Sequence, residues 1–349
     1  MEIKDNNTNQ RNLGIDFLRV WMCFGVVLIH FWMPESTNSE IERWFIHQTQ
    51  QLAVPVFMLI SFVVLSKEGT GFLMSKEKLG KRLKRLAIPV AIWAIVYAAI
   101  YLLAQTLLHK DYNINIGTFL SQLFIGHEYN KPMWFQNTLI YFTVLFYLIY
   151  KVDEHWRGGG ILCLLMLTMV SFVFQYSGLN HQMLDSIEEN IRIPLGRFIN
   201  MLPYACMGIL LVQSGVLNYL RSHPISVLVL TTVFVLICIF VPEWGTDTFG
   251  SNGLGLYLMC ISLVAIFYIL PFEKLPLGCQ KIISVFSKYT LGIYCIHNMI
   301  GGFYNQILVP RFGFPYYSLI ECLIVFAVSL VISVLIYQIP NKFCKSIVS

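Results

Sequence analysis

An arginine and a histidine flank ten apolar or small residues in the stretch RVWMCFGVVLIH, which runs from Arg19 to His30. Eleven positions of an α-helix turn through about 1,100°, so the two side chains share one face, about 16 Å apart along the axis. An imidazole can accept a proton near neutral pH, and a guanidinium can bind an anion. The spacing therefore places a base and an anion-binding group at two depths of one helix face.

Asp16 lies one turn before Arg19, at the spacing of an i,i+3 ion pair. A charged group at the centre of a membrane helix costs about 2.5–3.5 kcal/mol on insertion scales, so such groups usually serve a purpose. Alternatively, Arg19 extends to the inner interface and His30 lies at the outer one, both at little cost. Asp16 favours an ion pair that faces the interior of a bundle.

Two more arginines lie three positions apart in the basic segment KRLKRLAIP. Arg82 and Arg85 therefore share one side of a helix, and two guanidinium groups there can bind a phosphate through paired hydrogen bonds. The same residues also suit a positively charged anchor or a contact with lipid headgroups. The spacing leaves both interpretations open.

Further polar or aromatic residues occur near or inside apolar segments later in the chain. Trp134 opens an apolar segment in MWFQN, where an interfacial aromatic is also common. Tyr294 and His297 lie in the middle of another segment, in LGIYCIHN, where a neutral structural histidine is the ordinary alternative. Glu321 lies one turn inside the last apolar segment and is the only acid deep in that half of the chain.

The elements that must position these residues are membrane helices. The chain has 349 residues, of which 56% are hydrophobic and 12% charged, and a mean hydropathy of +0.65. A soluble domain usually has about a quarter charged residues. A 20-residue window predicts about ten spans. They cover 14–33, 50–66, 86–108, 133–150, 160–177, 197–214, 225–242, 254–270, 289–309 and 317–338. The expected fold is a single all-α polytopic bundle over residues 1–349.

The distribution of Lys and Arg predicts which loops face the cytoplasm. With the N-terminus inside, most basic residues fall in cytoplasmic segments, as the positive-inside rule requires. Residues 1–13 and 339–349 are then cytoplasmic tails of a multi-pass protein in the inner or plasma membrane. The external segment 117–127 is either a short amphipathic helix at the surface or an ordinary loop.

Several other functions are not expected. The nine cysteines lie mostly in apolar spans, with no CxxC pair and no metal-ligand spacing, so the sequence predicts neither a metal site nor a redox pair. The net charge of +5 is spread over loops, without an extended basic tail, so nucleic acid is not an expected partner.

The motifs around these residues resemble, in order and over nearly the whole chain, those of membrane acyltransferase family 3. The first is IDFLRVWMCFGVVLIHF at 15–31, with Arg, ten residues and His, and the second is VPVFMLISFVVL at 54–65. KRLKRLAIP at 81–89, MWFQNTLIYF at 133–142 and TLGIYCIHN at 290–298 follow. The second motif keeps Ser61 but has Phe62 where glycine is usual. In the last, Thr290 and Leu291 replace the usual Ser-Tyr pair.

The resemblance implies transfer of an acyl group, usually acetyl, from cytoplasmic acyl-CoA to a hydroxyl of a surface or envelope carbohydrate. His30 would be the general base, or would carry the acyl group covalently. The implied catalytic residues are His30, Arg19 and Asp16. The implied donor-binding residues are Arg82, Arg85 and Trp134, with Arg19 a further candidate. Residues near the acceptor or behind the catalytic groups would be Ser61, Tyr294, His297 and Glu321.

The implied partners are acetyl-CoA or another acyl-CoA as co-substrate, a carbohydrate or lipid-linked glycan as acceptor, and membrane lipid. The sequence leaves homo-oligomer formation open. A transporter or flippase for an anionic lipid or sugar phosphate is the alternative, because it would use the same intramembrane Arg and His groups. A receptor or sensor is a third class. It predicts a ligand pocket without catalysis.

Overall fold

The computed structural model describes residues 11–68, 76–108, 115–126, 131–176, 189–223, 225–240 and 253–349. These residues form helices and contain no strand, which confirms the expected all-α class. The expected N-terminal tail lies outside the described residues up to position 10.

A helix occurs at each of the ten expected spans. They are α1 (Leu13–Phe31), α2 (Glu40–Glu68), α3 (Lys76–Leu108), α5 (Trp134–His155), α6 (Gly159–Tyr176), α8 (Glu189–Gln213), α10 (Ile225–Phe240), α11 (Leu254–Ile269), α13 (Thr290–Phe303) and α15 (Leu319–Gln338). Among the described residues, α1, α2, α3, α8 and α15 are each long and apolar enough to cross a membrane. The number of ten crossings stays a prediction.

Shorter helices connect or flank these elements. They are α4 (Ile116–Phe124), α9 (Val216–Ser222), α12 (Leu277–Lys288), α14 (Val309–Phe312) and α16 (Lys342–Ser346). Helix α4 confirms a helix within the segment 117–127, and it begins at a capping box between Asn115 and Thr118. A π-helical turn, η4 (Tyr304–Leu308), joins α13 to α14.

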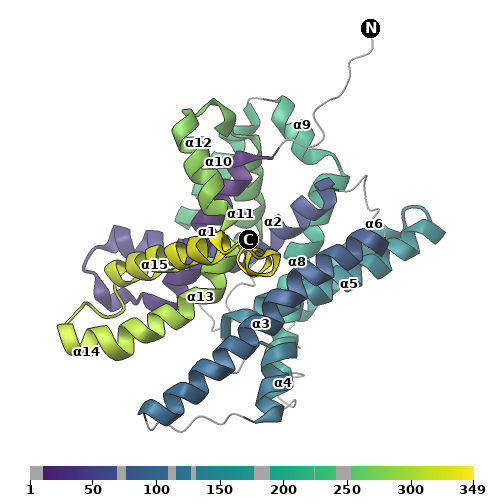
Figure 1. Ribbon diagram of the computed structural model, residues 1–349. Helices are drawn as coiled ribbons and strands as arrows, with labels where there is room; N and C mark the ends of the chain where they lie inside the picture. Colours follow the sequence, from purple (N-terminus) through teal and green to yellow (C-terminus); the bar gives the residue numbers. More distant parts are fainter. Residues whose placement is uncertain are drawn as a thin grey trace.

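Helix α1 packs in the middle of one group of helices, against α2, α11, α12, α13 and α15 (Figure 1). Asn12 caps its start, since the side chain accepts a hydrogen bond from the amide of Ile15. Gly25 allows α2 to approach closely, because a Cβ there would lie 2.9 Å from the Cβ of Ala53. Small residues at such crossings are typical of membrane helix packing. This crossing holds the helix that carries Arg19 and His30.

A second group contains α3, α5, α6 and α8, with α3 and α5 running side by side (Figure 1). Helix α8 joins this group to the first through an extensive interface with α2. A Cβ on Gly208 would lie 2.5 Å from the carbonyl oxygen of Leu59, so the two backbones nearly touch there. The interior of both groups forms one continuous apolar core.

The C-terminal segment folds back onto the bundle. After α16, Ile347 and Val348 are buried. The indole of Trp93 donates to the carbonyl of Ile347 at 3.2 Å, and the amide of Gly292 donates to that of Val348 at 3.1 Å. Part of the segment expected as the tail 339–349 therefore packs between α3 and α13. Its side of the membrane stays a prediction.

Candidate functional site

The structure brings His30 and His297 together, although they lie far apart in the chain. Their ring centroids are 5.4 Å apart, with an angle of 40° between the ring planes. His30 is half-buried at the last turn of α1, whereas His297 is fully buried in the middle of α13. The two imidazoles form a pair of proton-accepting groups where α1 ends.

The close approach of α1 and α13 depends on a glycine next to this pair. A Cβ on Gly301 would lie 2.0 Å from the ring of Phe31, far inside van der Waals contact. Gly301 follows His297 by one helical turn, and Phe31 directly follows His30. The absence of a side chain at position 301 therefore sets the spacing between the two histidines.

His297 is fixed in orientation and keeps one nitrogen free of protein partners among the described residues. Its Nδ1 lies 2.6 Å from the carbonyl oxygen of Tyr294 and 3.2 Å from that of Ile293. A carbonyl only accepts, so Nδ1 carries the hydrogen and Nε2 holds a lone pair. Nε2 is buried and has no hydrogen-bond partner in the described part of the chain. The backbone carbonyls thus account for Nδ1 of His297, as expected for a structural histidine. They do not account for Nε2.

The expected pair of Asp16 and Arg19 is present, but Asp16 has other partners as well. Nη1 of Arg19 lies 3.7 Å from Oδ1 of Asp16, whose side chain is only 4% exposed. The same carboxylate accepts hydrogen bonds from Nε of Arg11 and, at 2.7 Å, from the hydroxyl of Ser287. Asp16 therefore connects the start of α1 to α12 and orients Arg19.

The basic segment belongs to α3 itself, which begins at Lys76 rather than at the expected position 86. Arg82 is half-buried: its Nε donates to the hydroxyl of Thr143 on α5 at 3.0 Å, and its guanidinium lies 5.3 Å from the ring centroid of Phe62. Arg85 is exposed. The two arginines thus share a helix but differ in environment.

Position 62, where this chain departs from the motif, is occupied by a packed aromatic ring. Phe62 is fully buried and lies edge-on to Phe146, with ring centroids 4.8 Å apart. It therefore provides the surface over which the Arg82 guanidinium lies. The neighbouring Ser61 is half-buried on the same helix, α2.

Trp134 lies against Arg197, the residue at which the expected sixth span begins. The guanidinium carbon of Arg197 is 4.8 Å from the centroid of the Trp134 ring. The expected sixth span began at position 197, but α8 begins at Glu189, so Arg197 lies within the helix. Its Nη1 is buried without a hydrogen-bond partner among the described residues. The sequence does show an arginine next to an apolar run. Because the expected span began too late in the chain, it did not show that this arginine lies inside a helix.

Tyr294 lies between the Trp134 region and the histidines. Its hydroxyl donates to the carbonyl of Pro132, and its ring centroid is 6.0 Å from that of His297. On the adjacent α5, Gln136 is buried and its amide lies 3.6 Å from the sulfur of Cys295. The beginning of α5 thus faces α13 through polar as well as aromatic side chains.

Glu321 lies at the start of α15 and is fully buried. Its carboxylate accepts from the amide of Tyr317 at 2.6 Å, and its own amide donates to the hydroxyl of Ser318 at 3.2 Å. These contacts stabilise the helix start, as in a capping box. Among the described residues no ion pair joins it to a histidine, and its Oε1 has no hydrogen-bond partner.

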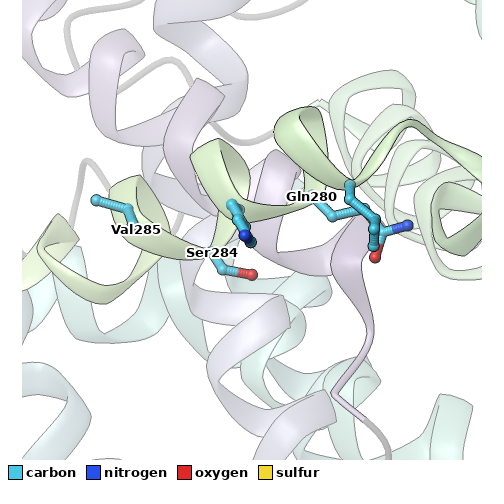
Figure 2. Close-up of a pocket in the computed structure, with 5 residues that line it drawn as sticks. Gln280, Ser284 and Val285 are labelled. Carbon is cyan, nitrogen blue, oxygen red and sulfur yellow. The ribbon is translucent and has the colours of Figure 1, made fainter.

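A shallow depression lies along α12 (Figure 2). It is lined by Leu277, Gln280, Lys281, Ser284 and Val285. None of the residues expected to do chemistry lines it. The depression is therefore not a candidate for the catalytic centre.

Comparison with known proteins identifies the family. The family model described as an acyltransferase domain matches residues 12–338. Curated proteins and solved structures gave no significant match. The matched range includes the paired histidines, the Asp16–Arg19 ion pair, Arg82 and Trp134. The chain belongs to membrane acyltransferase family 3.

Proposed function

We propose that the protein is an acyl-CoA-dependent O-acyltransferase that moves an acyl group, acetyl in the first instance, to a carbohydrate hydroxyl of the cell envelope. The observation that supports this most is the pair of imidazoles, His30 and His297, 5.4 Å apart at the end of α1. Imidazole groups can accept and donate protons near neutral pH, so a pair of them suits proton transfer better than the simple binding of a ligand.

In the proposed reaction His30 acts as general base. It takes the proton from the acceptor hydroxyl while the hydroxyl oxygen attacks the thioester carbonyl. The new C–O bond forms, the C–S bond breaks, and the proton then passes to the departing thiolate of CoA. His297 is held by Tyr294 and lies beside His30, so it is placed to stabilise the protonated base. An acyl group carried covalently on His30 would need the same geometry.

Arg82 is the main donor-binding residue in this proposal. Its guanidinium is held by Thr143 and lies over Phe62. A guanidinium is suited to bind phosphate oxygens such as those of coenzyme A. Arg85 is exposed on the same helix and adds charge near the cytoplasmic entrance. Arg19, which Asp16 orients, is a third candidate.

The proposal also includes the location and the acceptor. The protein would lie in the inner or plasma membrane with both termini in the cytoplasm, and the acceptor would be a surface or lipid-linked glycan. Acyl-CoA would bind from the cytoplasmic side and the glycan from the opposite side. The steps proposed here use side chains of the chain itself and involve no bound metal.

The decisive experiment uses the purified full-length protein and acetyl-CoA labelled in the acetyl group. The expected result is slow release of free CoA thiol without an acceptor, and faster release when a carbohydrate hydroxyl is present. The variant His30→Ala should bind CoA and release little thiol. A transporter or a receptor would bind or move its ligand with no release of thiol, and that result would overturn the proposal.

A further inference from the structure

Arg197 is half-buried, and its Nη1 is buried without a hydrogen-bond partner among the described residues. No carboxylate lies within ion-pair distance of it among the described residues, and its guanidinium carbon lies 4.8 Å from the ring of Trp134. A desolvated guanidinium is costly unless it is paired, and a cation–π contact offsets part of that cost. Such a residue is expected to pair with a ligand.

Two buried amides with free polar atoms accompany this arginine. Asn137 follows Trp134 by three residues on α5, and Asn200 follows Arg197 by three residues on α8, so each lies on the same helix face as its neighbour. Both are only 3% exposed, and Nδ2 of Asn137 and Oδ1 of Asn200 have no hydrogen-bond partner among the described residues. Buried polar atoms in proteins are nearly always satisfied. We call Trp134, Asn137, Arg197 and Asn200 the Arg197 site.

The atoms of the Arg197 site define the chemistry of what would bind. Guanidinium and amide N–H groups donate to anionic oxygens, whereas the free amide oxygen of Asn200 accepts from a hydroxyl. An acidic carbohydrate has both kinds of group on one molecule. A carboxylate or a phosphate on the ligand would also supply the charge that Arg197 lacks.

The position of the site along α5 indicates which substrate carries that anion. Arg82 contacts Thr143, which lies about 14 Å further along the helix than Trp134. Trp134 lies at the start of α5, near Tyr294 and on the same side as the histidine pair. The Arg197 site is therefore separate from Arg82 and close to where the acceptor must react. In this proposal Trp134 faces the acceptor, instead of the donor that the resemblance implied.

We propose that the Arg197 site binds the acidic group, a carboxylate or a phosphate, of the carbohydrate acceptor. The inference rests on the proposed acyltransferase function, since that function supplies an acceptor. The alternative source of the same chemistry is a phosphate of coenzyme A. The experiment below separates the two sources and does not depend on turnover.

Thermal unfolding of the purified full-length protein is measured with three probes: glucuronate, glucose as its neutral match, and coenzyme A. For the wild type we expect glucuronate to raise the melting temperature at concentrations where glucose does not. Arg197→Gln should raise the half-saturating concentration of glucuronate at least about tenfold, the usual effect of losing a charged hydrogen bond. Its response to coenzyme A should be unchanged. Arg82→Gln, the matched control, should show the reverse pattern.

A second variant gives the Arg197 guanidinium a partner within the protein instead of removing its charge. Asn200→Asp has nearly the same shape and places a carboxylate at i,i+3 from Arg197, where it can pair with the guanidinium. We expect this variant to be at least as stable as the wild type and to lose its response to glucuronate. Arg197→Gln should also unfold no earlier than the wild type without ligand, since it removes a partly desolvated charge that has no ion-pair partner among the described residues.

Three results would overturn the inference. In the first, glucuronate and glucose have equal effects on the wild type. In the second, Asn200→Asp keeps the full response to glucuronate. In the third, Arg197→Gln loses the response to coenzyme A and keeps that to glucuronate, which assigns the site to the donor. Failure of the acyltransferase proposal is seen separately, as the absence of thiol release from acetyl-CoA.

Discussion

At the scale of single residues, the two paired imidazoles are chemically unequal. His297 is fully buried and its Nδ1 is held by a backbone carbonyl, so its ring cannot turn freely. His30 is half-buried on the last turn of α1, so its ring is more exposed than that of His297. This difference in burial supports the proposal that His30 is the base and that His297 positions it.

His30→Ala should reduce acyl transfer by at least about 100-fold, the lower range for loss of a general base. Binding of CoA and the melting temperature should change little, because the side chain is not part of the packed core. Wild-type activity should also fall as the pH is lowered, since a protonated imidazole cannot accept a proton. Rates of thiol release across the range in which histidine titrates, with CoA titrations alongside, check both points. Wild-type turnover in the Ala variant would exclude the proposed base.

Arg82 and Arg85 should contribute unequally to donor binding. Arg82→Ala should weaken CoA binding more than Arg85→Ala, because Arg82 is held in place by Thr143 and Phe62 whereas Arg85 is exposed. Arg82→Lys should restore binding in part, since lysine keeps the charge but loses the planar fork. Titration of the purified variants with CoA measures each effect. Unchanged binding in the double Ala variant would assign both residues to anchoring at the membrane surface.

At the scale of secondary-structure elements, the crossing of α1 and α13 controls the distance between the histidines. Phe31 occupies the space that a side chain at position 301 would need. A Cβ on the neighbouring Gly302 would have no atom of the described residues within 4 Å, so this position provides a control.

Gly301→Ala should lower acyl transfer and destabilise the protein by about 1–3 kcal/mol, the usual cost of overpacking. Gly302→Ala should have little effect on either. Adding Phe31→Leu to Gly301→Ala should recover part of the activity, because it removes the ring that the new methyl group meets. Activity and melting temperature of the three variants provide the measurement. Equal effects at positions 301 and 302 would show that the crossing does not set the active geometry.

The helices could be predicted from the sequence, whereas the contacts between distant helices could not. An apolar run of about 20 residues prefers lipid to water, so α1, α3 and α15 could be located from composition alone. The proximity of His30 to His297 and of Trp134 to Arg197 depends on how separate helices pack. No short motif in a single sequence predicts this packing. The Asp16–Arg19 pair was predictable because both residues lie on one helix turn. Arg11 and Ser287, the other two partners of Asp16, could be identified only from the folded structure.

At the scale of the whole molecule, the proposed reaction requires that donor and acceptor enter from opposite sides. Glu40 and Lys76 are exposed at the first residues of α2 and α3, and the predicted topology places Glu40 outside and Lys76 inside. Cysteines at these two positions, with exposed Cys279 replaced by serine, should react from opposite sides of sealed vesicles. An impermeant thiol reagent added before and after permeabilisation makes the measurement. Labelling of both from the same side would remove the basis for separate donor and acceptor faces.

Helix α8 has a consequence for how the protein is inserted during synthesis. It contains Arg197, Asn200 and two prolines, and an arginine near a helix centre alone costs about 2.5–3.5 kcal/mol on insertion. As an isolated segment it would therefore partition into lipid less readily than α1, α2, α3 or α15 when it leaves the translocon. Helix α2 is synthesised earlier and meets α8 backbone to backbone at Gly208. We therefore expect the earlier helix to retain α8 in the bilayer, so that α8 enters the membrane together with α2 rather than alone.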